Sequence, residues 1–421
     1  MRNLLVALFT LTSSVALAQA AEPQPGTGDA TTPSTTETSS TETSTTAAAE
    51  PSLDERITTA EGKIASFEEQ NIETKNDLSS LKKLKFSGYV QGRYQYQEAD
   101  ETGEDIRLTD SFSRFSVRRG RIKATYTADY AQYVLQIDAV PDGVTLKDAE
   151  ATFFIPGTKQ AMSLTLGATK WGFGYEVPQS SSDREFPERT RVVRAFLPGE
   201  RDLGLKFNGK FGVLRVTAGL FNGASSATPL DADKEKDVIG RIGFDLKWLS
   251  GGVSGWYGGA MARRTTGAEP DTYRRYYDRY RVGADLQAYF DVIPLGGTAI
   301  KAEYIAGKTY GGATNATNVD VPASGWYALL VQNLGLSNAV AVRYDYFDPA
   351  NGTKARAASN GIRPASTNAV GTLGVALLHY FGENLKLTAA YELPMTATVE
   401  DVDAVEDPAD NLFTLQLQAR F

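Results

Sequence analysis

Residues 411–421 read NLFTLQLQARF, and the two-residue alternation of apolar and polar side chains in this stretch is the pattern by which we interpret the rest of the chain. Apolar and polar side chains alternate along it without a break: Phe413, Leu415, Leu417, Ala419 and Phe421 are apolar, and Thr414, Gln416, Gln418 and Arg420 are polar. Successive side chains of a strand point to opposite faces, so the pattern predicts a β-strand between two different environments. An antiparallel sheet on a soluble core is the alternative for one such strand taken alone.

The position of this strand favours a membrane barrel. A strand that ends the chain on an aromatic residue, here Phe421, resembles the closing strand of bacterial outer-membrane barrels. We therefore expect an even number of similar strands upstream. We also expect the barrel-assembly machinery to recognise the chain through Phe421.

The amino end predicts export. Residues 1–20 combine Arg2, an apolar stretch and Ala18-Gln19-Ala20, which predicts a secretory signal peptide cleaved after Ala20. No other stretch approaches the ~18 apolar residues that a spanning helix needs. A spanning protein without helices must be a closed barrel, because lipid offers no partner to unpaired strand edges. There is no cysteine, which excludes disulfides and thiolate metal sites.

Two segments precede the predicted barrel. Residues 21–50 are rich in Thr, Ser and Pro and hold too few large apolar side chains to fold, so we expect a disordered spacer. Residues 51–84 are predicted to form a periplasmic coiled coil, with a helix packed on the barrel as the alternative. Its core positions follow 4-3-4-3 spacing: Leu53, Ile57, Ala60, Ile64, Phe67, Asn71, Thr74, Leu78 and Leu81. The formal charge of −8 lies mostly in this front part, because residues 1–85 carry seven basic and twelve acidic side chains.

Residues 85–421 are predicted to form an all-β, transmembrane antiparallel barrel of about sixteen strands. The expected strands are 86–97, 112–125, 131–139, 148–155, 163–170, 201–208, 213–221, 238–247, 252–261, 280–290, 298–306, 324–332, 339–347, 369–380, 385–393 and 411–421. Long polar loops alternate with short turns, which is typical of outer-membrane barrels; the connection at 140–147 is the short exception. Within the strands, alternation assigns apolar side chains to lipid and charged ones to the lumen. A barrel of sixteen strands leaves an aqueous channel.

The loop at 171–200 is the candidate constriction. A loop of ~30 residues without structure of its own is usually functional, so we expect it to fold into the barrel. A solvated surface loop is the alternative, because acidic and basic residues are mixed in it. The basic ones are Arg184, Arg189, Arg191 and Arg194, and the acidic ones are Glu176, Asp183, Glu185, Glu188 and Glu200.

Basic side chains also gather on the second predicted strand. Its apolar phase differs by one residue before and after Arg118-Arg119-Gly120, which predicts a β-bulge there. Across the bulge, Arg114, Arg118, Arg119, Arg121 and Lys123 can all point inward, and Arg93 on the first strand shares the lumen face. A guanidinium group suits planar, bidentate contact with an oxyanion.

Residues 86–421 resemble the phosphate-selective porins O and P. The resemblance is carried by FSGYVQGR at 86–93, Arg-Arg-Gly-Arg at 118–121, LKDAEATF at 146–153, residues 167–177, FLPGERDLG at 196–204 and GLFNG at 219–223. It implies a trimeric sixteen-strand channel whose third loop enters the pore. By motif match it implies that Arg93, Arg118 and Arg119 are pore arginines, that Asp148 accepts a phosphate proton by hydrogen bonding, and that Lys170 stands for a loop lysine. The balanced charge of the long loop departs from the family.

The expected function is a porin for passive diffusion of small anions, such as phosphate or polyphosphate, in the outer membrane of a Gram-negative bacterium. The front segment would lie in the periplasm and the barrel would contact lipid and lipopolysaccharide. A weakly selective general porin, or a tether or adhesin barrel with little transport, are the alternatives. No cofactor and no nucleic-acid partner are expected.

An enzyme is disfavoured by the residue types present. The only histidine, His379, has no serine beside it on its own face of the strand. One imidazole and no thiol give no basis for a metal enzyme. The acidic run at 400–410 lacks the glycine of a calcium-binding EF loop and is interpreted as a solvated outer loop.

Overall fold

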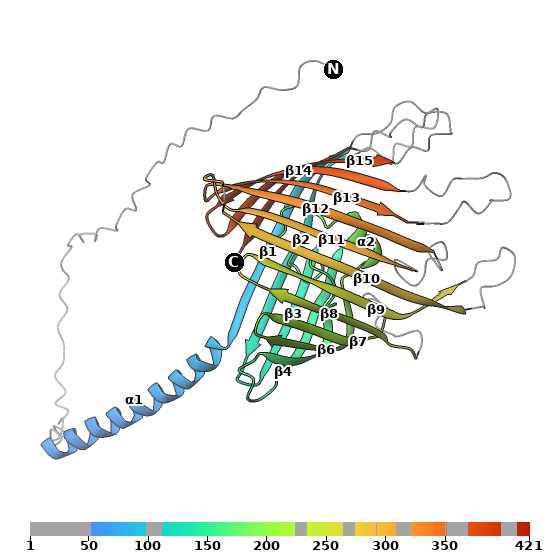
Figure 1. Ribbon diagram of the computed structural model, residues 1–421. Coiled ribbons are helices and arrows are strands. Elements are labelled where there is room, and N and C mark those ends of the chain that lie inside the picture. Colours follow the sequence, from blue (N-terminus) through green and yellow to red (C-terminus); the bar gives the residue numbers. More distant parts are fainter. Residues whose placement is uncertain are drawn as a thin grey trace, which may run out of the picture. The chain divides into compact units, whose positions relative to one another are not determined.

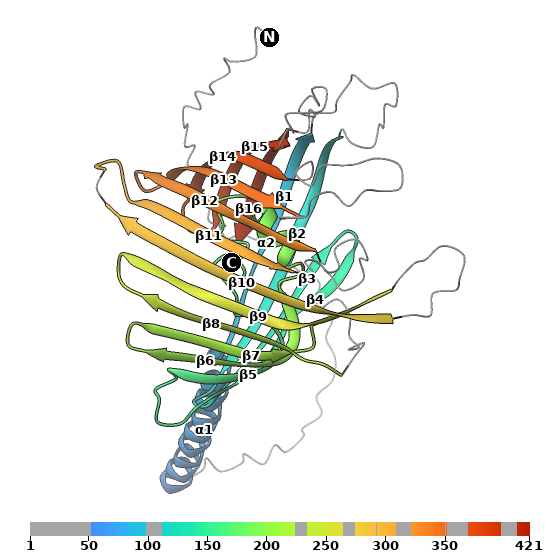
Figure 2. The ribbon, with the colours of Figure 1, turned by 45° about the vertical axis from the view of Figure 1, so that its right-hand side comes forward.

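Sixteen antiparallel strands form one closed barrel (Figures 1 and 2). The computed structural model describes residues 52–97, 112–223, 234–263, 274–291, 293–308, 321–349, 351, 369–396 and 411–421. The strands are β1 Leu84–Gln97, β2 Phe112–Thr127, β3 Ala131–Val140, β4 Gly143–Phe154, β5 Met162–Lys170, β6 Arg201–Phe211, β7 Leu214–Phe221, β8 Asp237–Asp245, β9 Leu249–Arg263, β10 Arg274–Phe290, β11 Thr298–Lys308, β12 Pro322–Leu334, β13 Asn338–Asp348, β14 Val370–Phe381, β15 Leu385–Thr396 and β16 Leu412–Arg420. The predicted sixteen-strand barrel is confirmed.

The barrel closes where β16 pairs with β1. Phe421 and Gly88 exchange two backbone hydrogen bonds, each 3.0 Å long. A Cβ atom at Gly88 would lie 2.6 Å from the Phe421 ring and 2.4 Å from the Arg121 carbonyl oxygen, so only glycine fits there. The last residue of the chain therefore belongs to the seam that closes the cylinder.

The two faces of the wall differ as the alternation predicts. On β16, Leu417 is 47 % exposed on the outside, whereas Gln418 is 2 % exposed on the inside. Gln418 accepts a hydrogen bond of 2.7 Å from Gln91 Nε2 across the seam. On β10, Val282 is exposed and Arg281 is buried. An apolar outer surface with a polar lumen is the arrangement of a barrel placed in lipid.

Strand β2 contains the predicted bulge. Arg119 lies opposite Gln91 and Val117 lies opposite Gly92, so Arg118 is the extra residue. Because of the bulge, Arg118 and Arg119 both reach inward. Arg114 pairs with the buried, lumen-facing Gln95 and so lies on the inner face as expected; its side chain is exposed, and its guanidinium lies 4.2 Å from the ring centre of Phe112.

A second bulge lies in β4 and was not predicted. Asp148 pairs with Gln136 and Leu146 pairs with Ile137, so the pairing skips Lys147. The bulge lets β4 begin at Gly143, and only residues 141–142 separate it from β3. The connection predicted at 140–147 was therefore too long, because the bulge interrupts the alternation that marks a strand.

Two helices accompany the strands. Helix α1, Leu53–Lys82, begins with a capping box in which Ser52 and Glu55 exchange hydrogen bonds of 3.0 and 3.3 Å. Helix α2, Arg191–Phe196, belongs to the loop after β5. Neither helix of the described residues is long and apolar enough to cross a membrane. The coiled coil stays a prediction, and the signal peptide, the spacer and the acidic run at 400–410 lie outside the described residues.

Candidate functional site

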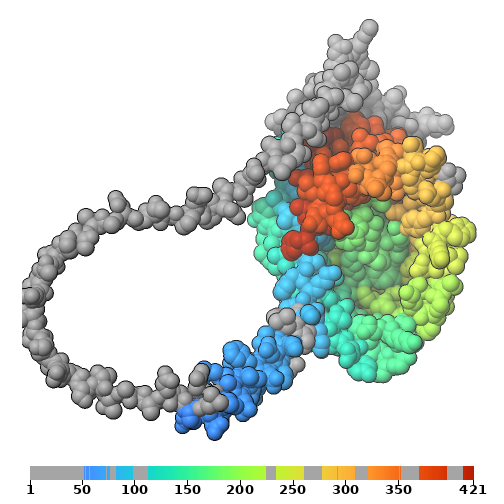
Figure 3. All heavy atoms as spheres, turned by 90° about the vertical axis from the view of Figure 1, so that its left-hand side faces the viewer, coloured from blue at the N-terminus to red at the C-terminus, as the bar shows by residue number. Residues whose placement is uncertain are grey.

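The loop of residues 171–200, here called the inward loop, lies inside the barrel. Its atoms are among the green ones within the ring of strands in Figure 3. Its side chains and backbone contact strands around the lumen, from β1 and β2 to β11, β13, β15 and β16. The predicted inward folding of this loop is confirmed.

Apolar side chains fix the inward loop to one side of the lumen. The loop side of this cluster is made of Trp171, Phe173, Val177, Phe186, Val192, Val193, Phe196 and Leu197, all buried. Trp171 packs edge-on against Trp256 of β9 at 4.6 Å between ring centres, and Phe196 packs against Phe347 of β13 at 6.0 Å. Helix α2 lies on β11, β12 and β13. Each fully buried side chain of this size contributes about 1.5–3 kcal/mol, so the loop is held firmly against that wall.

On the opposite side, Glu188 of the inward loop binds three arginines of the wall. Its Oε1 accepts from Arg118 Nε at 2.6 Å and from Arg93 Nη1 at 3.0 Å. Its Oε2 accepts from Arg119 Nη2 at 3.2 Å and from Arg118 Nη2 at 3.3 Å. Burial by itself would raise the pKa of Glu188, but these arginines, Arg119 first, lower it well below the usual range. The three predicted pore arginines thus meet at one carboxylate.

Other wall cations hold the rest of the loop. Lys301 pairs with Glu185 at 2.6 Å. Lys386 donates to the carbonyl oxygen of Ser182 at 2.7 Å, and Arg121 donates to the Ser181 hydroxyl at 3.1 Å. These contacts come from β2, β11 and β15, so moving the loop within the lumen would break hydrogen bonds or an ion pair to at least one of these strands.

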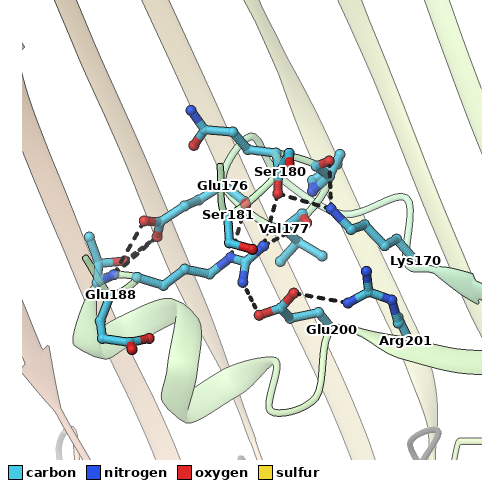
Figure 4. Close-up of polar contacts among 12 residues, drawn as sticks. Lys170, Glu176, Val177, Ser180, Ser181, Glu188, Glu200 and Arg201 are labelled. Carbon is cyan, nitrogen blue, oxygen red and sulfur yellow. Dashed lines mark hydrogen bonds and ion pairs between the residues drawn. The ribbon is translucent and has the colours of Figure 1, made fainter. Parts of the chain in front are cut away.

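Arg189 holds the loop together from within; three of the residues that it contacts, Glu176, Val177 and Glu200, are labelled in Figure 4. It donates to the carbonyl oxygens of Glu176, Val177 and Gln179 at 3.0–3.1 Å and pairs with Glu200. Burial, followed by the nearby Arg184, lowers the pKa of Arg189 to about 9. Arg189 therefore acts as a structural cation of the loop.

Two further predicted site residues are also engaged with protein groups. Lys170 donates to the carbonyl oxygens of Pro178 and Gln179 at 3.0 and 2.9 Å (Figure 4). Asp148 accepts from Arg201 Nε at 2.6 Å. Both contacts join the wall to the inward loop or to its end, where β6 begins.

Two basic cavities lie between the inward loop and the wall of β2 to β7. The first, about 340 Å³, contains eight basic and three acidic side chains: Arg118, Arg119, Arg121, Lys147, Arg184, Arg189, Arg194 and Arg201 with Asp138, Glu188 and Glu200. The second, about 390 Å³, contains five basic and two acidic side chains: Arg121, Lys123, Lys170, Arg201 and Lys206 with Asp148 and Glu150. Arg121 and Arg201 line both cavities.

The two cavities follow one another along the strands. The first includes residues 197–200 and Lys147, which lie toward the rim of the long loops. The second includes Lys123 and Asn208, which lie nearer the short turns. We call these two cavities, which share Arg121 and Arg201, the basic passage.

The remaining arginines of the loop take different positions. Arg184 is buried and lines the first cavity, and none of its three guanidinium nitrogens has a hydrogen-bond partner among the described residues. Arg194 is exposed and lines the same cavity. Arg191, at the start of α2, lines neither of these two cavities. Arg93 of β1 lines neither cavity either, so Arg191 and Arg93 are the two predicted site residues outside the basic passage.

Two lysines and one arginine that line the basic passage were not predicted from the sequence. Lys206 lies between Leu205 and Phe207, so strict alternation would have placed it in the lumen. Arg201 begins β6 directly after the loop, where no alternation precedes it. Lys147 is hidden by the bulge in β4.

The single histidine has a local role. His379 Nδ1 is hydrogen-bonded to Asn338 Oδ1 at 2.7 Å, and its ring packs on Phe381 with centres 4.2 Å apart. Within the described ranges no three His, Cys, Asp or Glu side chains are grouped so as to hold a metal ion.

The sixteen-strand barrel with an inward loop after β5 is the fold of the outer-membrane porins. No family model matches the chain, and no curated protein sequence matches it. Among solved structures, the outer-membrane channel DcaP of Acinetobacter baumannii is similar over 80 % of this chain and 97 % of its own, with a TM-score of 0.54 and 12 % identity. OmpT of Vibrio cholerae, in its trimer form, is similar over 80 % of this chain and 99 % of its own, with a TM-score of 0.53 and 12 % identity. The anion-selective porin of Comamonas acidovorans is similar over 80 % of this chain and 99 % of its own, with a TM-score of 0.52 and 12 % identity. At this identity the likeness concerns the fold.

Proposed function

We propose that the protein is an outer-membrane porin through which small anions diffuse passively along the basic passage. The observation that carries this proposal is the excess of basic side chains in both cavities, eight against three and five against two. An ion inside either cavity lies within about one Debye length, ~8 Å at physiological ionic strength, of the basic side chains that line it. Clusters of Arg and Lys favour anions in pores.

Phosphate and polyphosphate are the proposed solutes. The support is the resemblance of the motifs around Arg93, Arg118 and Arg119 to phosphate-selective porins, and the suitability of guanidinium for oxyanions. The porin of Comamonas acidovorans, similar in fold, is described as anion-selective. Glu188 and the other carboxylates reduce the positive field, so we expect moderate selectivity. These same carboxylates favour a weakly selective general porin as the second candidate.

We further propose a homotrimer in the outer membrane of a Gram-negative bacterium, with the front segment in the periplasm. The trimer is supported by the heptad spacing within α1 and by OmpT of Vibrio cholerae, similar in fold and solved as a trimer. The apolar outer face fits contact with lipid and lipopolysaccharide. The role of Phe421 in the seam fits recognition of the carboxyl end during barrel assembly.

Ion selectivity in a planar bilayer tests the proposed function. The purified full-length protein is inserted into the bilayer, and the reversal potential is measured in a gradient of potassium chloride and then of potassium phosphate. We expect the sign of the reversal potential to show a preference for anions over cations in both salts. A cation-selective pore contradicts the proposal, and a potential near zero in both salts favours the weakly selective alternative.

A further inference from the structure

The carboxylate of Glu188 is saturated by wall arginines. A carboxylate offers about four acceptor positions, and four guanidinium hydrogen bonds fill those of Glu188, two at each oxygen. They come from Arg93 of β1 and from Arg118 and Arg119 of β2, at 2.6–3.3 Å. The inward loop therefore delivers an anion to the place where the wall is best suited to bind one.

This arrangement places a tethered anion in competition with dissolved ones. A carboxylate and an oxyanion such as phosphate present the same acceptor oxygens to a guanidinium fork. The side chain of Arg118 is 39 % exposed, so solutes reach it while it is paired. Glu188 takes two of the five N–H donors of Arg118, so a dissolved oxyanion meets a guanidinium of which one bidentate edge and the charge are already engaged.

The other carboxylates of the loop do not have this position. Glu185 forms an ion pair with Lys301 of β11, away from β1 and β2. Glu176 accepts from the backbone and hydroxyl groups of Thr190 within the loop itself. Glu200 pairs with Arg189 and Arg201, and neither is one of the three arginines that meet at Glu188.

We propose that Glu188 is the residue that sets the strength of anion selectivity in this channel. It offsets one of the three positive charges of Arg93, Arg118 and Arg119 and competes with permeating oxyanions for these arginines. The inference rests on the proposed function, which it deepens: the preference for anions then comes from Arg121, Arg201, Lys147 and their neighbours, and Glu188 limits what the three wall arginines add. Glu188 acts through these arginines and is therefore a positioning and specificity residue.

The first test compares Glu188→Gln with Glu185→Gln in the full-length protein. Both variants remove one negative charge from the same loop, but only the first releases the three arginines. In a salt gradient we expect Glu188→Gln to raise the ratio of anion to cation permeability roughly two- to threefold, the size expected for one charge acting at the distance of a hydrated ion. Glu185→Gln should change the ratio by less. Equal shifts in the two variants would overturn the proposal, because they would show a general effect of loop charge.

The second test measures competition. Inorganic phosphate is added to a channel that conducts chloride, and the concentration that halves the chloride current is determined. We expect this concentration to fall at least twofold in Glu188→Gln and to return toward the wild-type value in Glu188→Gln with Arg118→Gln. Glu188→Asp keeps the carboxylate and should differ from the wild type less than Glu188→Gln does.

A purely structural role of Glu188 gives a different result. If Glu188 only pins the loop, Glu188→Gln raises single-channel conductance and current noise while the permeability ratio and phosphate block stay at the wild-type values, and the proposal is then wrong. The comparison is made between variants, so it also holds if the wild type proves to be cation-selective. In that case the proposed function fails, and the difference between Glu188→Gln and Glu185→Gln still decides the inference.

Discussion

Arg118 and Glu188 form a bidentate ion pair across the space between β2 and the inward loop, with Nε at 2.6 Å and Nη2 at 3.3 Å from the two carboxylate oxygens. Because the Arg118 side chain is 39 % exposed, solvent screens the pair, and its contribution to stability is modest. Its importance lies in its position, since it joins the most accessible of the three arginines at Glu188 to the inward loop.

Reversing two charges of the wall should reverse or reduce anion preference. In Arg118→Glu with Arg119→Glu, two carboxylates replace guanidinium groups in the first cavity and repel Glu188 as well. We expect the reversal potential in a salt gradient to move toward cations. Arg215→Glu is the control, because Arg215 pairs with Asp245 and lines neither of the two cavities. An unchanged potential in the double variant would show that these arginines do not control permeation.

Loosening the apolar anchor of the loop should widen the passage. Phe196 is fully buried and packs on Phe347, so Phe196→Ala should cost about 3–5 kcal/mol of local packing. The sixteen-strand wall does not depend on this contact, and we expect an intact barrel with higher and noisier single-channel conductance. Protease cleavage within 171–200 should increase in parallel. Phe115→Ala, at a side chain 85 % exposed on the outer face, is the matched control.

Removing Phe421 should block assembly of the barrel. The deletion breaks both backbone hydrogen bonds to Gly88 and removes the terminal aromatic ring. We expect unfolded chain in the periplasm and a low yield in the outer membrane, measured by fractionation and by heat-modifiable migration. Gly88→Val should have a similar effect, because its Cβ would collide with the Arg121 carbonyl oxygen. Normal surface yield of the truncated protein would contradict this role of the closing strand.

The effect of Glu188 on selectivity should be insensitive to mild acid. The wall arginines hold the pKa of Glu188 well below its usual range, so its carboxylate stays ionised above the ordinary glutamate pKa and becomes protonated only as pH falls through the lower value of the folded protein. The difference in reversal potential between the wild type and Glu188→Gln should therefore stay constant from about pH 7 to about pH 5, a range above the ordinary glutamate pKa. A difference that disappears within that range would show that Glu188 is protonated early and that the ion pairs are weak.

The front segment should affect oligomer assembly more than barrel closure. We expect SDS-stable oligomers, most simply trimers, that dissociate on heating. Deleting residues 22–84 should weaken these oligomers and leave an inserted barrel, since the deletion removes only the first pair of β1 with β2, Leu84 with Tyr126. Cross-linking that yields only monomers of the full-length protein would contradict the predicted coiled coil.

Alternation identified the strands because a wall between lipid and water requires a period of two, as Leu417 and Gln418 show. It also revealed the bulge in β2, where Val117 and Ile122 belong to different phases. The bulge in β4 was not predicted, because its two consecutive polar residues, Lys147 and Asp148, interrupt the alternation by which the strand is identified in the sequence.

Pairing within the site was not predictable. Glu188 and Arg118 lie 70 positions apart, and nothing in the local sequence distinguishes Glu188 from Glu185, which pairs with a different wall. The residue types in the sequence were enough to predict that the arginines and the loop belong to the pore. The ion-pair partner of each charged side chain depends instead on how apolar groups such as Trp171 and Phe196 position the loop in the barrel. Whether Arg93, Arg118 and Arg119 bind permeating anions stays a prediction.

Both bulges add a cation to the passage, Arg118 in β2 and Lys147 in β4. Inserting one residue into a regular strand would turn every following side chain to the wrong face. A bulge absorbs the insertion, so the lipid-facing rows before and after it keep their places. Single-codon insertions and deletions at these two sites could therefore change the charge of the passage while the outer wall stays the same, a route to new selectivity that leaves the membrane-embedded surface untouched.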